Sequence, residues 1–188
     1  MDRRNALRNL GILTGGMVLL PSCNFSEEKV SLVMNKLNIK ASEEALMKAL
    51  VSSIIPEGEI PGAGSLDVHN FVWIMVDDCM DDEKQASFLK GMKSFDSFVK
   101  KTNGTSFLSM QQTERENTLS GILSQVSEDT DPLQKDILFF VSATKGLTSY
   151  GYMQSEYIMK DVMPYTLIPG SYGPCETVDN SKRINVNG

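Results

Sequence analysis

The chain has few of the residues that most often perform chemistry. Its 188 residues include one histidine and three cysteines. No Cys-x-x-Cys pair occurs, which excludes the common zinc and thiol redox motifs and the Cys-x-x-Cys-His attachment site of c-type haem. No serine lies in a Gly-x-Ser-x-Gly elbow. The run 62–67 begins like a dinucleotide fingerprint, but it lacks the third glycine and follows Pro61 instead of a strand. The sequence therefore predicts no catalytic residue, cofactor site or metal site in this chain.

Basic residues are also in the minority. The chain has 18 lysines and arginines against 24 aspartates and glutamates, a formal net charge of −6. Nucleic acid binding needs a basic footprint that neutralises phosphates. The charge balance therefore argues against a nucleic acid partner.

Long apolar runs are missing as well. The run nearest the N-terminus, Leu10–Leu20, has 11 residues, whereas a helix needs roughly 20 to span a bilayer. Arg3 and Arg4 precede it, and this order of a basic region and a short apolar region is typical of an export signal. The paired arginines resemble a twin-arginine signal. An ordinary N-terminal amphipathic helix with incidental arginines is the alternative.

The apolar run ends in Leu-Pro-Ser-Cys, with the cysteine at position 23. This ending resembles a lipobox, in which the cysteine is lipidated and becomes the new N-terminus. We therefore expect residues 1–22 to be a removed signal segment, Cys23 to be lipidated, and 23–40 to act as a tether. The expected location is the periplasm, with the protein anchored in the membrane through Cys23.

Residues 41–188 are expected to form one domain, because apolar residues recur there with helical spacing and nowhere alternate with period two. Ser42 and the pair Ser109 and Gln112 are typical of helix starts, and Gly146 is typical of a helix end. The fold class is an all-α domain of about five to six amphipathic helices, followed by an irregular tail rich in Gly, Pro and Tyr. The expected helices cover about 42–55, 68–79, 82–103, 110–126, 132–146 and 156–162.

The remaining polar candidates favour structural roles. His69 opens the 68–79 helix without a metal-ligating partner spaced for it, so an ordinary surface or half-buried histidine is expected. The acidic run 77–83 lacks the glycine and the spacing of an EF-hand loop. It is interpreted as a solvated junction whose last acids cap the next helix. Cys79 and Cys175 could pair in an oxidising compartment, or Cys79 could be a buried apolar residue and Cys175 a loop thiol.

Several short blocks in a fixed order resemble a known family. The first is 54–63, Ile-Ile-Pro-Glu-Gly-Glu-Ile-Pro-Gly-Ala, and Phe107-Leu108 and Glu114-Arg115 follow. The last blocks are Phe-Phe at 139–140, Lys-Gly-Leu-Thr at 145–148, Gly-Tyr at 151–152 and Ile-Pro-Gly at 168–170, ending at Cys175. Over residues 42–175 the chain is similar to the gluconate 2-dehydrogenase subunit 3 family, the small gamma subunits of membrane-bound flavoprotein dehydrogenases.

This resemblance implies a function. Such subunits carry no cofactor of their own; FAD is held by a catalytic glucose-methanol-choline-type oxidoreductase, and haem c by a cytochrome c subunit that often takes the electrons. The small subunit supplies the twin-arginine signal for the folded flavoprotein. We therefore expect a non-catalytic accessory subunit that aids export, assembly or anchoring of its partner. The alternatives are a stand-alone exported lipoprotein with a binding or structural role, and an independent enzyme built from His69, the run 77–83 and the tail tyrosines.

The expected partner interface combines the loop 56–65 with the tail 151–175, since irregular backbones can present a shaped surface and tyrosines often anchor interfaces. In the competing account, the loop and the tail pack on each other within one subunit. The expected interface residues are Pro61, Gly62, Tyr152, Tyr165, Pro169, Gly170 and Tyr172.

Overall fold

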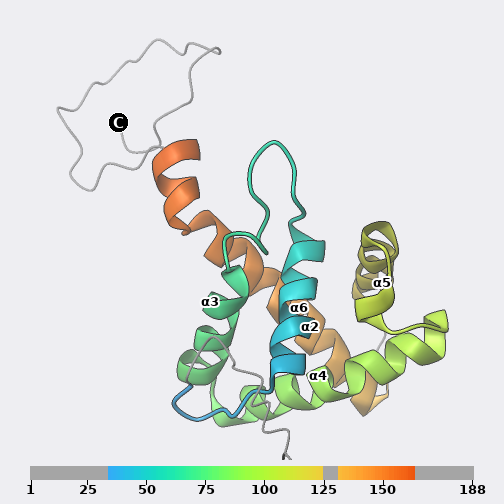
Figure 1. The fold of residues 1–188 in the computed structure, drawn as a ribbon. Helices are drawn as coiled ribbons and strands as arrows, with labels where there is room; N and C mark the ends of the chain where they lie inside the picture. The colour runs from blue at the N-terminus through green and yellow to red at the C-terminus, as the bar shows by residue number, and fades with distance from the viewer. Residues whose placement is uncertain (1–33, 125–130, 164–188) are drawn as a thin grey trace, which may run out of the picture.

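The computed structural model describes residues 34–124 and 131–163, and the elements in these ranges are all helical (Figure 1). This confirms the prediction of a single all-α domain. Within the described residues, no helix is both long and apolar enough to cross a membrane. The elements are α2 (Ala41–Ile54), α3 (Val68–Ile74), the π turn η1 (Met75–Cys79), α4 (Asp82–Asn103), the 3₁₀ turn η2 (Phe107–Ser109), α5 (Gln112–Ser124), α6 (Pro132–Met153) and the π turn η3 (Ile158–Val162).

Helices α4 and α6, each of 22 residues, make the most extensive contact between any two helices of the described chain. Gly91 of α4 lies where they approach most closely: a Cβ atom there would be 2.6 Å from the carbonyl carbon of Asp136 and 2.8 Å from Cβ of Phe140. Fully buried aromatic rings then fill the space beside this contact. The Phe140 ring centroid lies 5.0 Å from Phe88 and 5.6 Å from Phe95, in edge-to-face arrangements. Helices α2 and α3 lie beside each other and both contact α6 (Figure 1).

Several predicted helix boundaries are confirmed. Helix α2 ends at Ile54, just before Pro56, which cannot continue it. Asp81 caps α4 by accepting the Lys84 backbone N–H at 2.9 Å, as expected for the last acids of the run 77–83. Gly104, with φ of 78°, ends α4 in the left-handed conformation. Asp131 and Pro132 begin α6 as predicted.

Three boundary predictions are wrong. Helix α2 begins at Ala41 with Lys40 at the N-cap, and the Glu43 carboxylate accepts the Lys40 backbone N–H at 2.9 Å. The reciprocal cap of α5 lies two residues later than expected, where Glu114 accepts the Gln111 N–H at 2.9 Å, because Ser109 belongs to the preceding 3₁₀ turn. Helix α6 passes through Gly146 and runs to Met153. A glycine inside a helix costs only about 1 kcal/mol, which the buried residues on both sides of Gly146 outweigh.

The predicted helix 68–79 contains a change of register. It is α-helical to Ile74 and then forms the π turn η1, which accommodates one extra residue. The shift turns Asp77 inward, to 1% exposed, and leaves Cys79 exposed. The expectations of a solvated Asp77 and a buried Cys79 are therefore both wrong. Cys175 lies outside the described residues, so its pairing stays a prediction.

Candidate partner-binding face

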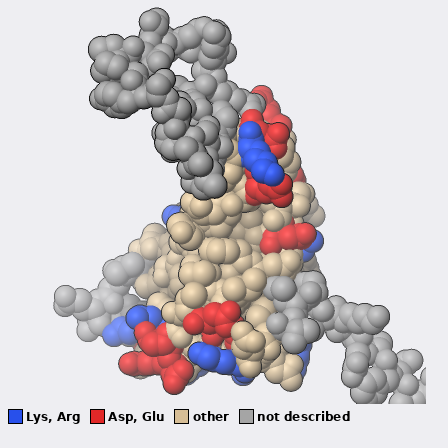
Figure 2. All heavy atoms as spheres, turned by 90° about the vertical axis from the view of Figure 1, so that its left-hand side faces the viewer, with Lys and Arg blue, Asp and Glu red and all other residues tan. Residues whose placement is uncertain are grey.

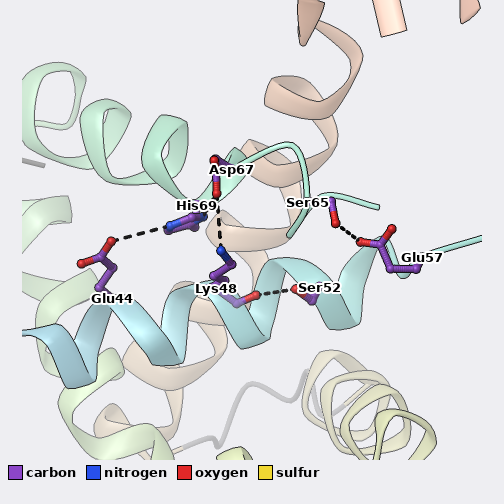
Figure 3. A network of polar contacts seen from close by, with 7 residues as sticks. All are labelled: Glu44, Lys48, Ser52, Glu57, Ser65, Asp67 and His69. Atoms are coloured by element: carbon purple, nitrogen blue, oxygen red, sulfur yellow. Dashed lines mark hydrogen bonds and ion pairs between the residues drawn. The ribbon is translucent and has the colours of Figure 1, made fainter. Parts of the chain in front are cut away.

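The loop 56–65 is held in one conformation by its own polar groups. The Glu57 carboxylate accepts the Gly62 backbone N–H at 2.9 Å and the Ser65 hydroxyl at 2.7 Å (Figure 3). These two donors hold the pKa of Glu57 below its ordinary value. Gly62 is required by space, because a Cβ there would lie 2.7 Å from the Pro56 carbonyl carbon. The loop is therefore a rigid part of the domain surface.

The end of α6 packs against this loop. The Tyr152 hydroxyl donates to the Pro61 carbonyl oxygen at 2.9 Å, and Tyr152 is only 8% exposed. Burial, followed by the nearby Glu57 charge, raises the pKa of Tyr152. Pro61, Gly62 and Tyr152 thus make contacts within the chain, and their part in a partner interface stays a prediction.

The other sequence-derived site residues remain predictions, because they lie outside the described residues. They are Arg3, Arg4, Cys23, Tyr165, Pro169, Gly170 and Tyr172.

Beside the loop lies a surface without charged side chains, formed by α3 and the second half of α6. Neither Val68–Ile74 nor residues 146–155 include an Asp, Glu, Lys or Arg. Figure 2 shows this side of the molecule, with a broad uncharged centre and charged side chains toward its two ends. Three of the five exposed large apolar side chains in the described residues belong to these two segments: Ile74 at 43%, Tyr150 at 57% and Met153 at 43%.

The two halves of this surface are joined by Phe71. Its ring centroid lies 5.8 Å from that of Tyr150, and a Cβ on Gly151 would be 3.0 Å from its Cγ. Only glycine at position 151 lets α3 approach α6 this closely. We call the surface around Phe71, Ile74 and Tyr150 the α3–α6 face. Sequence reasoning missed it, although Gly151 within an otherwise regular helix is a signal of close approach.

A cluster of polar side chains around His69 connects α2 to the start of α3 (Figure 3). His69 is 3% exposed, which corrects the expectation of a surface or half-buried residue. Its Nε2 lies 3.8 Å from a carboxylate oxygen of Glu44, and its Nδ1 lies 3.9 Å from one of Asp67. Burial, and next the charge of Lys48, lower the pKa of His69. The imidazole is therefore largely neutral at neutral pH.

The polar side chains around His69 do not form, with the run 77–83, the site that an independent enzyme would need. His69 faces Glu44 and Asp67, whereas Asp77 accepts hydrogen bonds from backbone N–H groups of residues 35–37. In the described residues, no three His, Cys, Asp or Glu side chains are arranged to hold a metal ion. The described part of the chain brings the candidate residues to separate places.

Comparison with protein families supplies the decisive observation. The family model described as gluconate 2-dehydrogenase subunit 3 matches residues 41–170. The chain belongs to this family. The match starts where α2 starts and includes the loop 56–65, α3 and all of α6. No curated protein and no solved structure matched the chain. Membership of the subunit 3 family indicates an accessory subunit of a dehydrogenase complex and therefore implies other subunits.

Proposed function

We propose that this subunit 3 protein is a non-catalytic accessory subunit of a periplasmic, membrane-associated, FAD-dependent sugar or alcohol dehydrogenase. It binds a glucose-methanol-choline-type flavoprotein through the α3–α6 face. The single observation that carries the docking proposal is the uncharged surface around Ile74 and Tyr150, next to a rigid loop. FAD belongs to the flavoprotein, and haem c belongs to a cytochrome c subunit.

The physical case rests on the cost of removing water. Burying charged groups without a partner is expensive, whereas burying apolar side chains is favourable, by about 25 cal/mol for each Å². Tyrosine and other large apolar side chains at the centre of a patch commonly carry most of the binding energy. The Tyr150 ring already packs against Phe71, so binding loses less side-chain entropy at this position.

Co-purification of the flavoprotein with charged variants tests this docking surface. Ile74→Asp and Tyr150→Asp each place a carboxylate on the α3–α6 face, and each should reduce flavoprotein recovery by at least about tenfold, since an unpaired buried charge costs several kcal/mol. Leu133→Asp and Leu108→Asp are matched controls, because these leucines are 40% and 44% exposed but lie at the start of α6 and on η2, outside the α3–α6 face. The controls should bind normally.

The same experiment can overturn the proposal. Equal recovery with all four variants would place the interface elsewhere. Loss of binding only with the leucine variants would place it on α6 near its start or on the 3₁₀ turn. No flavoprotein with the unaltered chain would favour the stand-alone lipoprotein.

Export and anchoring belong to the same proposal and rest on the sequence. Arg3 and Arg4 would direct the folded chain and its partner through the twin-arginine route, and a lipid on Cys23 would hold the complex at the membrane. Replacing both arginines with lysine should leave this chain and the flavoprotein in the cytoplasm. Cys23→Ser should prevent incorporation of a labelled fatty acid. Normal periplasmic yield of the flavoprotein, or an unlabelled natural chain, would contradict the respective role.

A further inference from the structure

The segment before α2 is held against the domain by one buried carboxylate. Asp77 accepts the backbone N–H of Asn35 at 2.6 Å, of Lys36 at 3.0 Å and of Leu37 at 2.8 Å. Three successive N–H groups converging on one anion form a concave backbone site of the kind that binds anions in many proteins. Part of the expected tether, residues 34–40, is therefore docked on the domain, and Ile39 is buried there.

The π turn makes this contact possible. It turns Asp77 inward, and the Gln85 side-chain amide donates to the freed carbonyl oxygens of Val76 at 2.9 Å and Asp77 at 3.3 Å. Burial acts to raise the pKa of Asp77, but the three backbone donors outweigh it and hold that pKa below the ordinary value. The carboxylate stays ionised at neutral pH, so the contact is closed under those conditions.

The neighbouring Asp78 has a lesser role. Among the described residues, it accepts only from the exposed side-chain amide of Asn35, at 2.9 Å. Asp77 therefore binds three backbone N–H groups of the N-terminal segment, whereas the adjacent Asp78 binds one exposed side chain of it.

We propose that Asp77 is a latch that fixes where the N-terminal segment leaves the domain, and thereby limits how far this end of the domain can lie from the membrane. This rests on the proposed anchor at Cys23. A chain spans at most about 3.5 Å per residue, so the 12 steps from Cys23 to Asn35 keep the latch within roughly 42 Å of the lipid. The loop 56–65 lies at the opposite end of the molecule from the start of α2 (Figure 1). The loop is therefore the end of the domain that lies farther from the point where the anchored segment leaves it.

Opening the latch has a defined geometric effect. The next fixed points are the buried Ile39 and the start of α2. Four more residues, 35–38, are then added to the length between the lipid and the first fixed point, which gains up to roughly 14 Å of reach. The domain gains distance from the membrane and freedom to turn.

Energy transfer from Trp73, the chain's only tryptophan, can report this distance. Trp73 is buried in α3, one turn before Asp77. The full chain with Cys79→Ser and Cys175→Ser is joined through Cys23 to a maleimide lipid, in vesicles that contain a dansyl-labelled lipid. This attachment needs neither cellular lipidation nor the flavoprotein, so failure of the latch and failure of the proposed function are distinguishable.

Asp77→Asn should lower transfer to about half or less, whereas the control Asp78→Asn should match the unaltered chain. Trypsin should cut after the exposed Lys36 at least about tenfold faster in Asp77→Asn. Circular dichroism and Trp73 emission check that the domain remains folded. If Asp77→Asn does not fold, Lys36→Pro removes one of the three donors on an exposed residue and should also lower transfer. Transfer that is equal in every folded variant, with unchanged cleavage at Lys36 in Asp77→Asn where that variant folds, would overturn the latch.

Discussion

Gly91 gives the sharpest test of how the core is packed. A methyl group at this position would lie 2.6 Å from the Asp136 carbonyl carbon and 2.8 Å from Cβ of Phe140. Ordinary contact begins near 3.4 Å, so Gly91→Ala requires α4 and α6 to separate by roughly 0.8 Å or more. The nearest atoms are backbone atoms of Asp136 and the Cβ of Phe140, and none of them moves away by a change of rotamer.

The cost follows from that separation. Overpacking a well-packed core typically costs 1–3 kcal/mol, and the upper end of this range applies because the Phe88, Phe95 and Phe140 rings must move together. Alanine also gains about 1 kcal/mol over glycine in helix propensity. We therefore expect a net loss of about 2 kcal/mol in the free energy of unfolding, or a fall of roughly 4–8 °C in Tm.

Gly146→Ala is the matched control. Gly146 also lies inside a long helix, but a Cβ there meets no atom within 4 Å. This variant should raise the free energy of unfolding by about 0.5–1 kcal/mol. Urea unfolding followed by circular dichroism measures both variants. A Gly91→Ala protein as stable as Gly146→Ala would refute the close approach of α4 and α6.

Two further predictions concern the polar contacts. The pKa of His69 in the folded chain lies below its ordinary value of 6.5. Between the folded and the unfolded pKa the unfolded chain binds more protons, so the free energy of unfolding falls as the pH is lowered below about 6.5. His69→Gln should flatten this dependence; an unchanged slope in urea titrations at several pH values would assign it to other groups. Tyr152→Phe removes the hydrogen bond to the Pro61 carbonyl and should cost about 1 kcal/mol by urea unfolding. Flavoprotein binding by the folded Tyr152→Phe protein should stay normal. A selective loss of binding would show that the Tyr152 hydroxyl contributes to the partner interface.

The helices could be predicted from the sequence where burial follows the helical period. Phe88, Phe95 and Val99 share one stripe, and all three are fully buried on α4. Local signals failed where tertiary contacts decide the outcome. Gly104 ends a helix with φ of 78° and Gly146 does not, although both glycines follow an apolar stripe. The difference lies in what packs beyond each glycine, which no local pattern records.

The π turn and the α3–α6 face show the same limit. The inward turn of Asp77 depends on backbone donors about 40 residues earlier and on Gln85 in the next helix. Enrichment in Gly, Pro and Tyr directed the interface prediction to the tail that begins at the end of α6. It could not distinguish the buried Tyr152 from Tyr150, which is 57% exposed only two residues earlier.

The most direct test of the accessory-subunit account is the flavin content of the tagged chain purified from the membranes of its own host. The account predicts that the chain is recovered with a glucose-methanol-choline-type flavoprotein, with the absorbance spectrum of bound FAD and with dehydrogenase activity toward an artificial electron acceptor. The Ile74→Asp chain, purified in the same way, should show at least about tenfold less of all three. A natural chain recovered without flavin, or one that turns over substrate after the flavoprotein has been removed, would contradict the account.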